Sequence, residues 1–411
     1  MRRVLLGLAG FLVIALIANT AFADDEPALK YSLDLNKLFG SAFEGEEEKA
    51  KVTCGGWGQF RFNYSNGTYS PSDGRPVGGN ESFQAWRFRF LPKVVYKWLS
   101  FGCQYETAST LTLLDFWSNI NCPKFEGAVQ LKAGQFIPPF GLQRPISPYK
   151  IRTVNYSQVV AYLFGGSDPL FPTWGNLRDT GVMIHGTKKF GEKQGDFQPS
   201  IYYALGFFTG EAANTTNSDP AFTTFFTAKV KAMKGILIGI SYEDGSRQVV
   251  DITVPVNRNF NRDRFGICWE FDLGDLLLYG EYIVGNMNPL SNGKHEDEDL
   301  IGETYHNKQM DVDGAYLVLA YFLSPKKFQV FGKVDWLDTP AWSLGTDSRS
   351  GEHDISYTQS WKYAIGFNVY INKHCKVQVV YEWTRAEGRA KLTPKVAGSE
   401  ERAYVVWGVN F

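Results

Sequence analysis

Polar and apolar residues alternate along most of this 411-residue chain. Between positions 59 and 64, for example, Gln, Arg and Asn occupy the odd positions, and Phe, Phe and Tyr occupy the even ones. Successive side chains of a β-strand point to opposite faces, so this pattern predicts strands with one polar and one apolar face. The chain is therefore expected to be all-β, since the pattern returns in segments 86–90, 101–106, 129–132, 328–336, 376–384 and 402–411.

The connections between these strands fall into two classes of length. Counting the alternating runs gives about sixteen strands of ~9–11 residues, the length that crosses a bilayer at a tilt. A soluble β-sandwich would also alternate, but it would not separate short and long connections so regularly. In lipid, only a closed barrel gives every strand a partner for its backbone groups. We therefore predict a transmembrane antiparallel β-barrel with short periplasmic turns and long outer loops, the loops being residues 65–82, 138–176, 210–220, 244–263, 286–311, 337–359 and 386–400.

The N-terminus has the composition of an export signal. Two arginines precede an apolar stretch, and the sequence Ala-Phe-Ala at 21–23 has the small residues of a cleavage site. We predict a signal peptide over 1–23, with a membrane-anchor helix as the alternative. An acidic periplasmic segment over 24–52 would follow, and the barrel domain would span 53–411. The predicted location is the outer membrane of a Gram-negative bacterium.

The charge and cysteine content exclude several function classes. Lys and Arg total 42 and Asp and Glu total 43, so no nucleic-acid partner is expected. The five cysteines are widely spaced and fit neither a disulfide scaffold nor a zinc or haem motif, so we expect no metal and no cofactor. A disulfide between Cys103 and Cys122 and a set of five free thiols both remain open.

The polar face carries the functional interpretation. A barrel of about sixteen strands is too wide for side chains to fill, so its lumen is expected to be an aqueous channel. Arg87 and Arg89 stand two residues apart, and both would face that lumen. Trp86, Phe88 and Phe90 would then face lipid.

One segment resembles a known family. The sequence KAGQFIPPFGL at 132–142 resembles the G-Q-F-x-x-P-F-G segment of the phosphate-selective porin O and P family. Two further pieces agree with that family, namely Leu-Leu-Asp at 113–115 and RDTGVMIHG at 178–186. The terminal Phe411, with apolar residues at alternate positions before it, is similar to the C-terminal signal of outer-membrane barrels.

The resemblance implies a trimeric, 16-stranded diffusion porin whose third loop folds into the barrel. It would pass small hydrophilic solutes, with a preference for anions such as phosphate, and would contact outer-membrane lipid and lipopolysaccharide. Charged side chains that line a constriction favour ions of opposite sign. The candidates are Arg61, Arg87, Arg89 and Lys132 at inward strand positions, and Arg144, Lys150 and Arg152 in the loop.

Two features depart from a phosphate-selective pore, and two other functions stay open. No motif places a long series of basic residues along the lumen, and the stretch HEDED at 295–299 makes one outer loop acidic. A barrel that sheaths an electron-transfer or transport complex would show the same pattern. An outer-membrane barrel enzyme would need a nucleophile and a histidine together, and none of the five histidines stands in such a motif.

Overall fold

The computed structural model describes residues 30–33, 50–65, 68–69, 76–77, 80–108, 110–164, 177–193, 195, 197–210, 213–214, 222–250, 257–289, 310–342, 355–389 and 396–411. The predicted signal peptide and the acidic stretch 295–299 lie outside these residues. No helix in the described part of the chain is long and apolar enough to cross a membrane.

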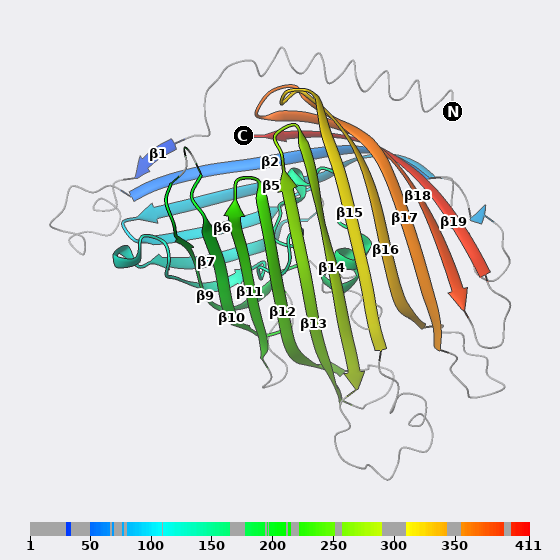
Figure 1. Ribbon diagram of the computed structural model, residues 1–411, viewed down its shortest axis with the longest axis horizontal. Coiled ribbons are helices and arrows are strands. Elements are labelled where there is room, and N and C mark those ends of the chain that lie inside the picture. Colours follow the sequence, from blue (N-terminus) through cyan, green and yellow to red (C-terminus); the bar gives the residue numbers. More distant parts are fainter. Residues whose placement is uncertain are drawn as a thin grey trace, which may run out of the picture.

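Sixteen antiparallel strands close into one barrel, as predicted (Figure 1). Neighbours along the sequence pair with each other, and β19 closes the circle by pairing with β2. The strands are β2 (Ala50–Ser65), β5 (Asn80–Tyr96), β6 (Leu99–Glu106), β7 (Thr112–Asn121), β8 (Gln130–Phe136), β9 (Asp179–Lys189), β10 (Ser200–Phe208), β11 (Thr223–Met233), β12 (Ile236–Val250), β13 (Asn257–Asp272), β14 (Leu276–Pro289), β15 (Met310–Ser324), β16 (Phe328–Trp342), β17 (Ile355–Tyr370), β18 (Cys375–Arg389) and β19 (Val396–Asn410).

A few short elements complete the fold. β1 (Lys30–Leu33) pairs antiparallel with the start of β2, and that start lies at Ala50 rather than at residue 53. β3 (Thr68–Tyr69) and β4 (Pro76–Val77) pair with each other. The helical elements within the described ranges are η2 (Pro123–Phe125), η3 (Pro148–Lys150) and α3 (Gln158–Phe164).

The two ends of the barrel differ in their connections, as the sequence predicted. Short turns lie at the upper left of Figure 1, and the strands β12 to β19 run far toward the lower right. These strands hold 14 to 16 residues, more than the predicted length. β12 continues to Val250 and β13 starts at Asn257, so most of the loop predicted over 244–263 is strand. The antiparallel ladder continues because its hydrogen bonds do not depend on the bilayer.

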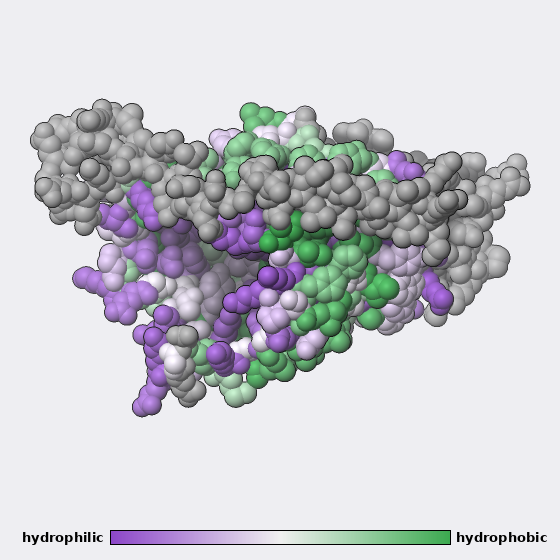
Figure 2. All heavy atoms as spheres, turned by 90° about the horizontal axis from the view of Figure 1, so that it is seen from above, coloured by the Kyte–Doolittle hydropathy of each residue, from purple (hydrophilic) through white to green (hydrophobic). Residues whose placement is uncertain are grey.

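The two faces of the wall separate by polarity. Large apolar side chains are exposed on the outer face, and Figure 2 shows hydrophobic side chains gathered along one flank. Examples on this face are Phe101, Phe116, Ile184, Leu205, Ile238, Leu319 and Ile365. Buried polar side chains occupy the inner face, among them Gln59, Arg89, Ser241, Glu243, Glu281, Gln329, Asp335, Gln378 and Glu382. A barrel with an apolar outside and a polar inside is the form that spans an outer membrane.

The cysteines form no bridge in the structure. Cys103 lies in β6 and Cys122 follows β7, and both are free, as are the other three. Of the two possibilities left open by the sequence, the structure therefore has the free thiols.

The C-terminal residue takes part in closing the barrel. The backbone N–H of Phe411 donates to the carbonyl of Gly56, and the N–H of Gly56 donates to the carbonyl of Phe411, both at 2.9 Å. The Phe411 ring packs against Phe88 and Phe90 with centroids 5.8 and 5.9 Å away. The last residue therefore fastens the β19–β2 seam.

Deleting Phe411 should lower the yield of folded barrel. The deletion removes two backbone hydrogen bonds and a ring contact, a loss of ~1–3 kcal/mol from the hydrogen bonds alone. The measurement is the heat-modifiable fraction on a gel after refolding in detergent. Phe116→Ala removes an exposed ring away from the seam and serves as the control. Equal folding of the deletion and the control would contradict the proposed role of Phe411.

Candidate functional site

The third loop folds into the barrel and forms the candidate site, as predicted, in the part that the structure describes, residues 137–164 and 177–178. Its first part runs from the end of β8 through Phe140, which is fully buried, to η3. Its helix α3 buries Val159 and Val160, and Val159 lies against Gly314 of β15. We call this segment loop three. It occupies lumen space that the wall alone would leave to water.

Acidic side chains of the wall hold loop three by its backbone. The carboxylate of Glu281 on β14 accepts from the N–H of Gln143 and from the hydroxyl of Tyr316, the latter at 2.6 Å. The carboxylate of Asp335 on β16 accepts from the N–H of Gln158 at 2.8 Å, at the start of α3. A carboxylate there also complements the partial positive charge of the helix N-terminus. The lumen acids on this wall are therefore used to position the loop.

Amide and ammonium groups of β17 and β18 hold the middle of loop three. Gln378 donates to the carbonyls of Ile151 and Arg152, both at 3.1 Å. Asn368 donates to the same Arg152 carbonyl at 3.2 Å, and Lys376 donates to that of Ile151 at 3.4 Å. Buried polar groups need such partners, so the pattern fixes the path of the loop across the wall.

One glycine is required where loop three meets Glu281. Gly141 has a φ of 62°, and a Cβ added there would collide with the Glu281 carboxylate. Its N–H donates to the Ser241 hydroxyl at 2.9 Å. Glycine is therefore needed at position 141, where the backbone of loop three lies close to the Glu281 carboxylate.

Gly141→Ala should loosen loop three. The left-handed conformation alone costs a non-glycine residue ~1–2 kcal/mol, and the collision adds to it. We expect a larger single-channel conductance and more current noise in planar bilayers. Gly332→Ala is the matched control, because nothing lies within 4 Å of a Cβ added there. Identical conductance in the two variants would show that loop three does not narrow the channel.

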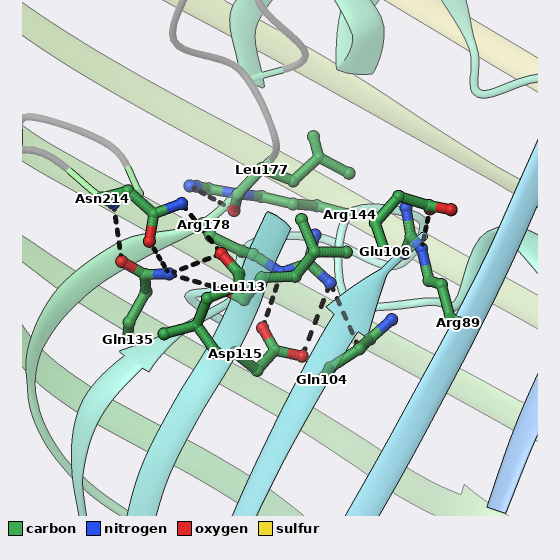
Figure 3. A network of polar contacts seen from close by, with 11 residues as sticks. Arg89, Gln104, Glu106, Leu113, Asp115, Gln135, Arg144, Leu177, Arg178 and Asn214 are labelled. Carbon is green, nitrogen blue, oxygen red and sulfur yellow. Dashed lines mark hydrogen bonds and ion pairs between the residues drawn. The ribbon is translucent and has the colours of Figure 1, made fainter. Parts of the chain in front are cut away.

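The base of loop three is fastened by the residues of the three motif pieces (Figure 3). Arg178 Nε donates to Asp115 Oδ1 at 2.6 Å, and the exposed fractions of the two side chains are 4% and 15%. Gln135 donates to the carbonyl of Leu114 at 2.8 Å and accepts from the N–H of Asn214 at 2.7 Å. The motif residues therefore join β7, β8 and the start of β9 where the loop leaves and re-enters the wall.

The predicted basic residues of β2 and β5 lie on the lumen side. Arg61 and Arg87 both stack on Trp86, with Cζ 4.1 and 3.8 Å from the ring centroid. Arg89 is buried and forms an ion pair with Glu106 at 2.7 Å. Arg61 also lies 5.6 Å from the Tyr404 ring centroid.

The expectation that Trp86 faces lipid is wrong. The register between β2 and β5 shifts at Gln59/Phe60, so that Gln59 pairs with Arg87 and Phe60 pairs with Ala85. Such a bulge gives one strand an extra residue and turns two successive side chains to the same face. Trp86 therefore joins Arg87 in the lumen, whereas Phe88 packs outside against Phe411.

The other four candidates differ in their surroundings. Lys132 lies inside, its Nζ 4.4 and 4.3 Å from the ring centroids of Trp117 and Phe136. Arg144 is buried, 3.4 Å from Glu243, and donates to the Leu177 carbonyl. Arg152 is half-buried and Lys150 is exposed. The structure thus brings Arg61 and Arg87 together, and it commits Arg89 and Arg144 to ion pairs.

Several functional residues were not identified as such from the sequence. Glu281, Asp335 and Gln378 position loop three, although the alternation had placed Asp335 and Gln378 on the polar face. Asp115 and Arg178 stood inside the motif pieces, but their pairing across 63 positions had no local signal. Trp86 was missed because a bulge interrupts the alternation.

Comparisons with known proteins bear on the fold. No protein-family model and no curated protein matches the sequence. Among solved structures, the anion-selective porin from Comamonas acidovorans has a TM-score of 0.58 at 10% identity, covering 88% of this chain and 100% of that one. The outer membrane channel DcaP of Acinetobacter baumannii has 0.52 at 11% identity, covering 90% and 99%. In-vitro folded OmpT of Vibrio cholerae, in a trimer form, has 0.52 at 10% identity, covering 88% and 99%.

The architecture therefore defines the class. A closed 16-stranded barrel with an apolar exterior and an inward third loop is the fold of the outer-membrane porins. The chain is an outer-membrane barrel of a Gram-negative bacterium with this porin fold.

Proposed function

We propose that the protein is a diffusion channel that prefers small anions, with oxyanions such as phosphate as the solute class. The observation that carries the proposal is the pair Arg61 and Arg87, which stack on Trp86 at the lumen side. A ring face orients a guanidinium without cancelling its charge. The resemblance of segment 132–142 to phosphate-selective porins supports the oxyanion.

The acidic side chains of the lumen favour the same proposal. Glu281 and Asp335 accept hydrogen bonds from loop three, and Glu243 lies between Arg144 and Arg264. Asp335 also forms an ion pair with Lys333 at 2.9 Å, and a carboxylate paired with a cation contributes less to the field that a passing ion meets. The positive charges of Arg61, Arg87 and Lys132 then determine the sign of the electrostatic field in the lumen.

A homotrimer is part of the proposal, together with contacts to membrane lipid and lipopolysaccharide. The trimer form of the Vibrio cholerae structure with this fold supports it. Mild cross-linking of the protein in native membranes should give a species of three chains. A product no larger than one chain would remove the trimer from the proposal.

The structure favours the channel over the two other functions. A barrel that sheaths a cytochrome needs a free lumen, whereas loop three crosses this one. The two histidines that the structure describes, His185 and His374, bind the side chains of Asn119 and Asn410. Purified protein should therefore carry no haem partner and show no esterase activity.

Liposome swelling tests the channel itself. Vesicles that contain the protein should swell faster in a small organic anion than in a cation of matched size, and protein-free vesicles should not swell. Swelling that does not depend on the charge of the solute would support the channel but contradict its preference for anions. No swelling above the protein-free control would contradict the channel function.

A further inference from the structure

The short turns of the barrel share a charge pattern. Exposed lysines there outnumber exposed acidic residues by ten to four among the described residues of the seven turns and the strand ends that enter them. The lysines are Lys97, Lys124, Lys188, Lys189, Lys193, Lys231, Lys234, Lys326, Lys327 and Lys373, and the acids are Glu126, Glu192, Asp272 and Asp275. We call these lysines the turn rim.

The same turns expose large apolar side chains. Six of the seven turns carry one exposed large apolar side chain each, with exposed fractions from 44% for Phe190 to 66% for Leu273. Five of the six stand within three residues of a turn-rim lysine. These five are Trp98, Phe125, Phe190, Met233 and Leu323.

The pairing of apolar and cationic side chains fits a membrane interface. A Lys side chain lays its apolar stem along an apolar surface and holds its ammonium group at the level of the headgroups. Aromatic and apolar neighbours at the same level enter the boundary of the acyl chains. The outer face next to these turns carries exposed Phe101, Leu131 and Ile184, so the turns border the lipid-facing band.

We propose that the turn rim binds the anionic phospholipid headgroups of the periplasmic leaflet. The described turns and strand ends, with ten exposed lysines against four exposed acids, complement a phosphate-bearing surface. An acidic soluble partner would match the lysines but would leave the paired apolar side chains unexplained. Figure 2 shows hydrophilic side chains gathered at the left-hand end, where the turns after β7 and β9 lie in Figure 1.

Native mass spectrometry of the purified protein tests the proposal. The protein is supplied with equal amounts of phosphatidylglycerol and phosphatidylcholine, and the retained lipids are counted. We expect phosphatidylglycerol to be retained preferentially. In the fourfold variant Lys188→Gln, Lys189→Gln, Lys326→Gln, Lys327→Gln that preference should fall by about fivefold or more, since each lysine near an anionic surface contributes to binding.

The same four positions replaced by Arg provide the matched control. Arg keeps the charge, so the preference for phosphatidylglycerol should be retained. The proposal is overturned if the wild-type protein retains the two lipids equally, if the Gln variant matches the wild type, or if the Arg variant loses the preference. Should the Gln variant fail to fold on a heat-modification gel, Lys326→Gln, Lys327→Gln alone gives the same comparison. Ion selectivity should be unchanged in all of them, so this test is independent of the proposed anion preference.

Discussion

Replacing Arg61 and Arg87 together by Ala is expected to reduce the ratio of anion to cation permeability by about tenfold. Each charge contributes ~1 kcal/mol to an ion at 4 Å even at the dielectric constant of water, and more in a narrowed lumen. Arg61 and Arg87 share one ring partner, so the two charges act at the same level of the channel. Their effect should not change between about pH 5 and pH 8, because arginine stays charged over that range.

Two controls distinguish the effect of the two lumen charges from the effect of removing any positive charge from the protein. Arg61→Lys with Arg87→Lys keeps both charges and should keep most of the preference for anions. Arg385→Ala removes an exposed charge of β18 and should leave the permeability ratio as it is. If the double Ala variant and Arg385→Ala behave alike, the two arginines do not set the selectivity, and Lys132, Lys150 and Arg152 become the remaining candidates.

Arg178→Ala is expected to destabilise the barrel at the base of loop three by ~3 kcal/mol, the lower end of the range for a buried pair, because it leaves the partly buried carboxylate of Asp115 without its partner. The pair fastens the end of the loop to the wall, since Arg178 leads into β9 and Asp115 lies on β7, the strand that pairs with β8 where the loop begins. The folded form should disappear from a heat-modification gel at a lower temperature. Single-channel records should show larger and more variable conductance.

The double variant Asp115→Ala, Arg178→Ala isolates the pair. Removing both charges should restore part of the stability lost in Arg178→Ala, because no unpaired charge remains. Equal stability of Arg178→Ala and the wild type would show that the pair does not fasten loop three. A double variant that loses the sum of the two single losses would indicate that the two side chains act independently.

The sequence predicted the fold well because the membrane constrains it at every strand. Each strand crosses the same two environments, so the alternation is repeated often enough to identify the barrel and the inward position of Arg87 and Arg89. The outer ends of β12 to β19 were predicted too short. Strand pairing continues beyond the bilayer. The side chains there do not contact lipid, so the alternation of polar and apolar residues that identifies the strands is not required.

The site was less predictable because it depends on contacts between distant segments. The bulge that turns Trp86 inward changes the register by one residue and leaves no mark in composition. The motif 132–142 predicted the inward loop, but not that Glu281 and Asp335 would hold it from the opposite wall. Glu281 is 138 positions from the N–H of Gln143 that it binds, and local patterns do not report such distances.

The reversal potential across a planar bilayer shows whether the lumen of this barrel favours anions. With a tenfold gradient of potassium chloride across the bilayer, the current through an anion-preferring channel is zero at a voltage whose sign opposes the flow of chloride. We expect that sign for the wild-type protein and a shift toward zero or beyond in the Arg61→Ala, Arg87→Ala variant. A reversal potential at zero, or of the sign that opposes potassium flow in the wild type, would contradict the preference for anions.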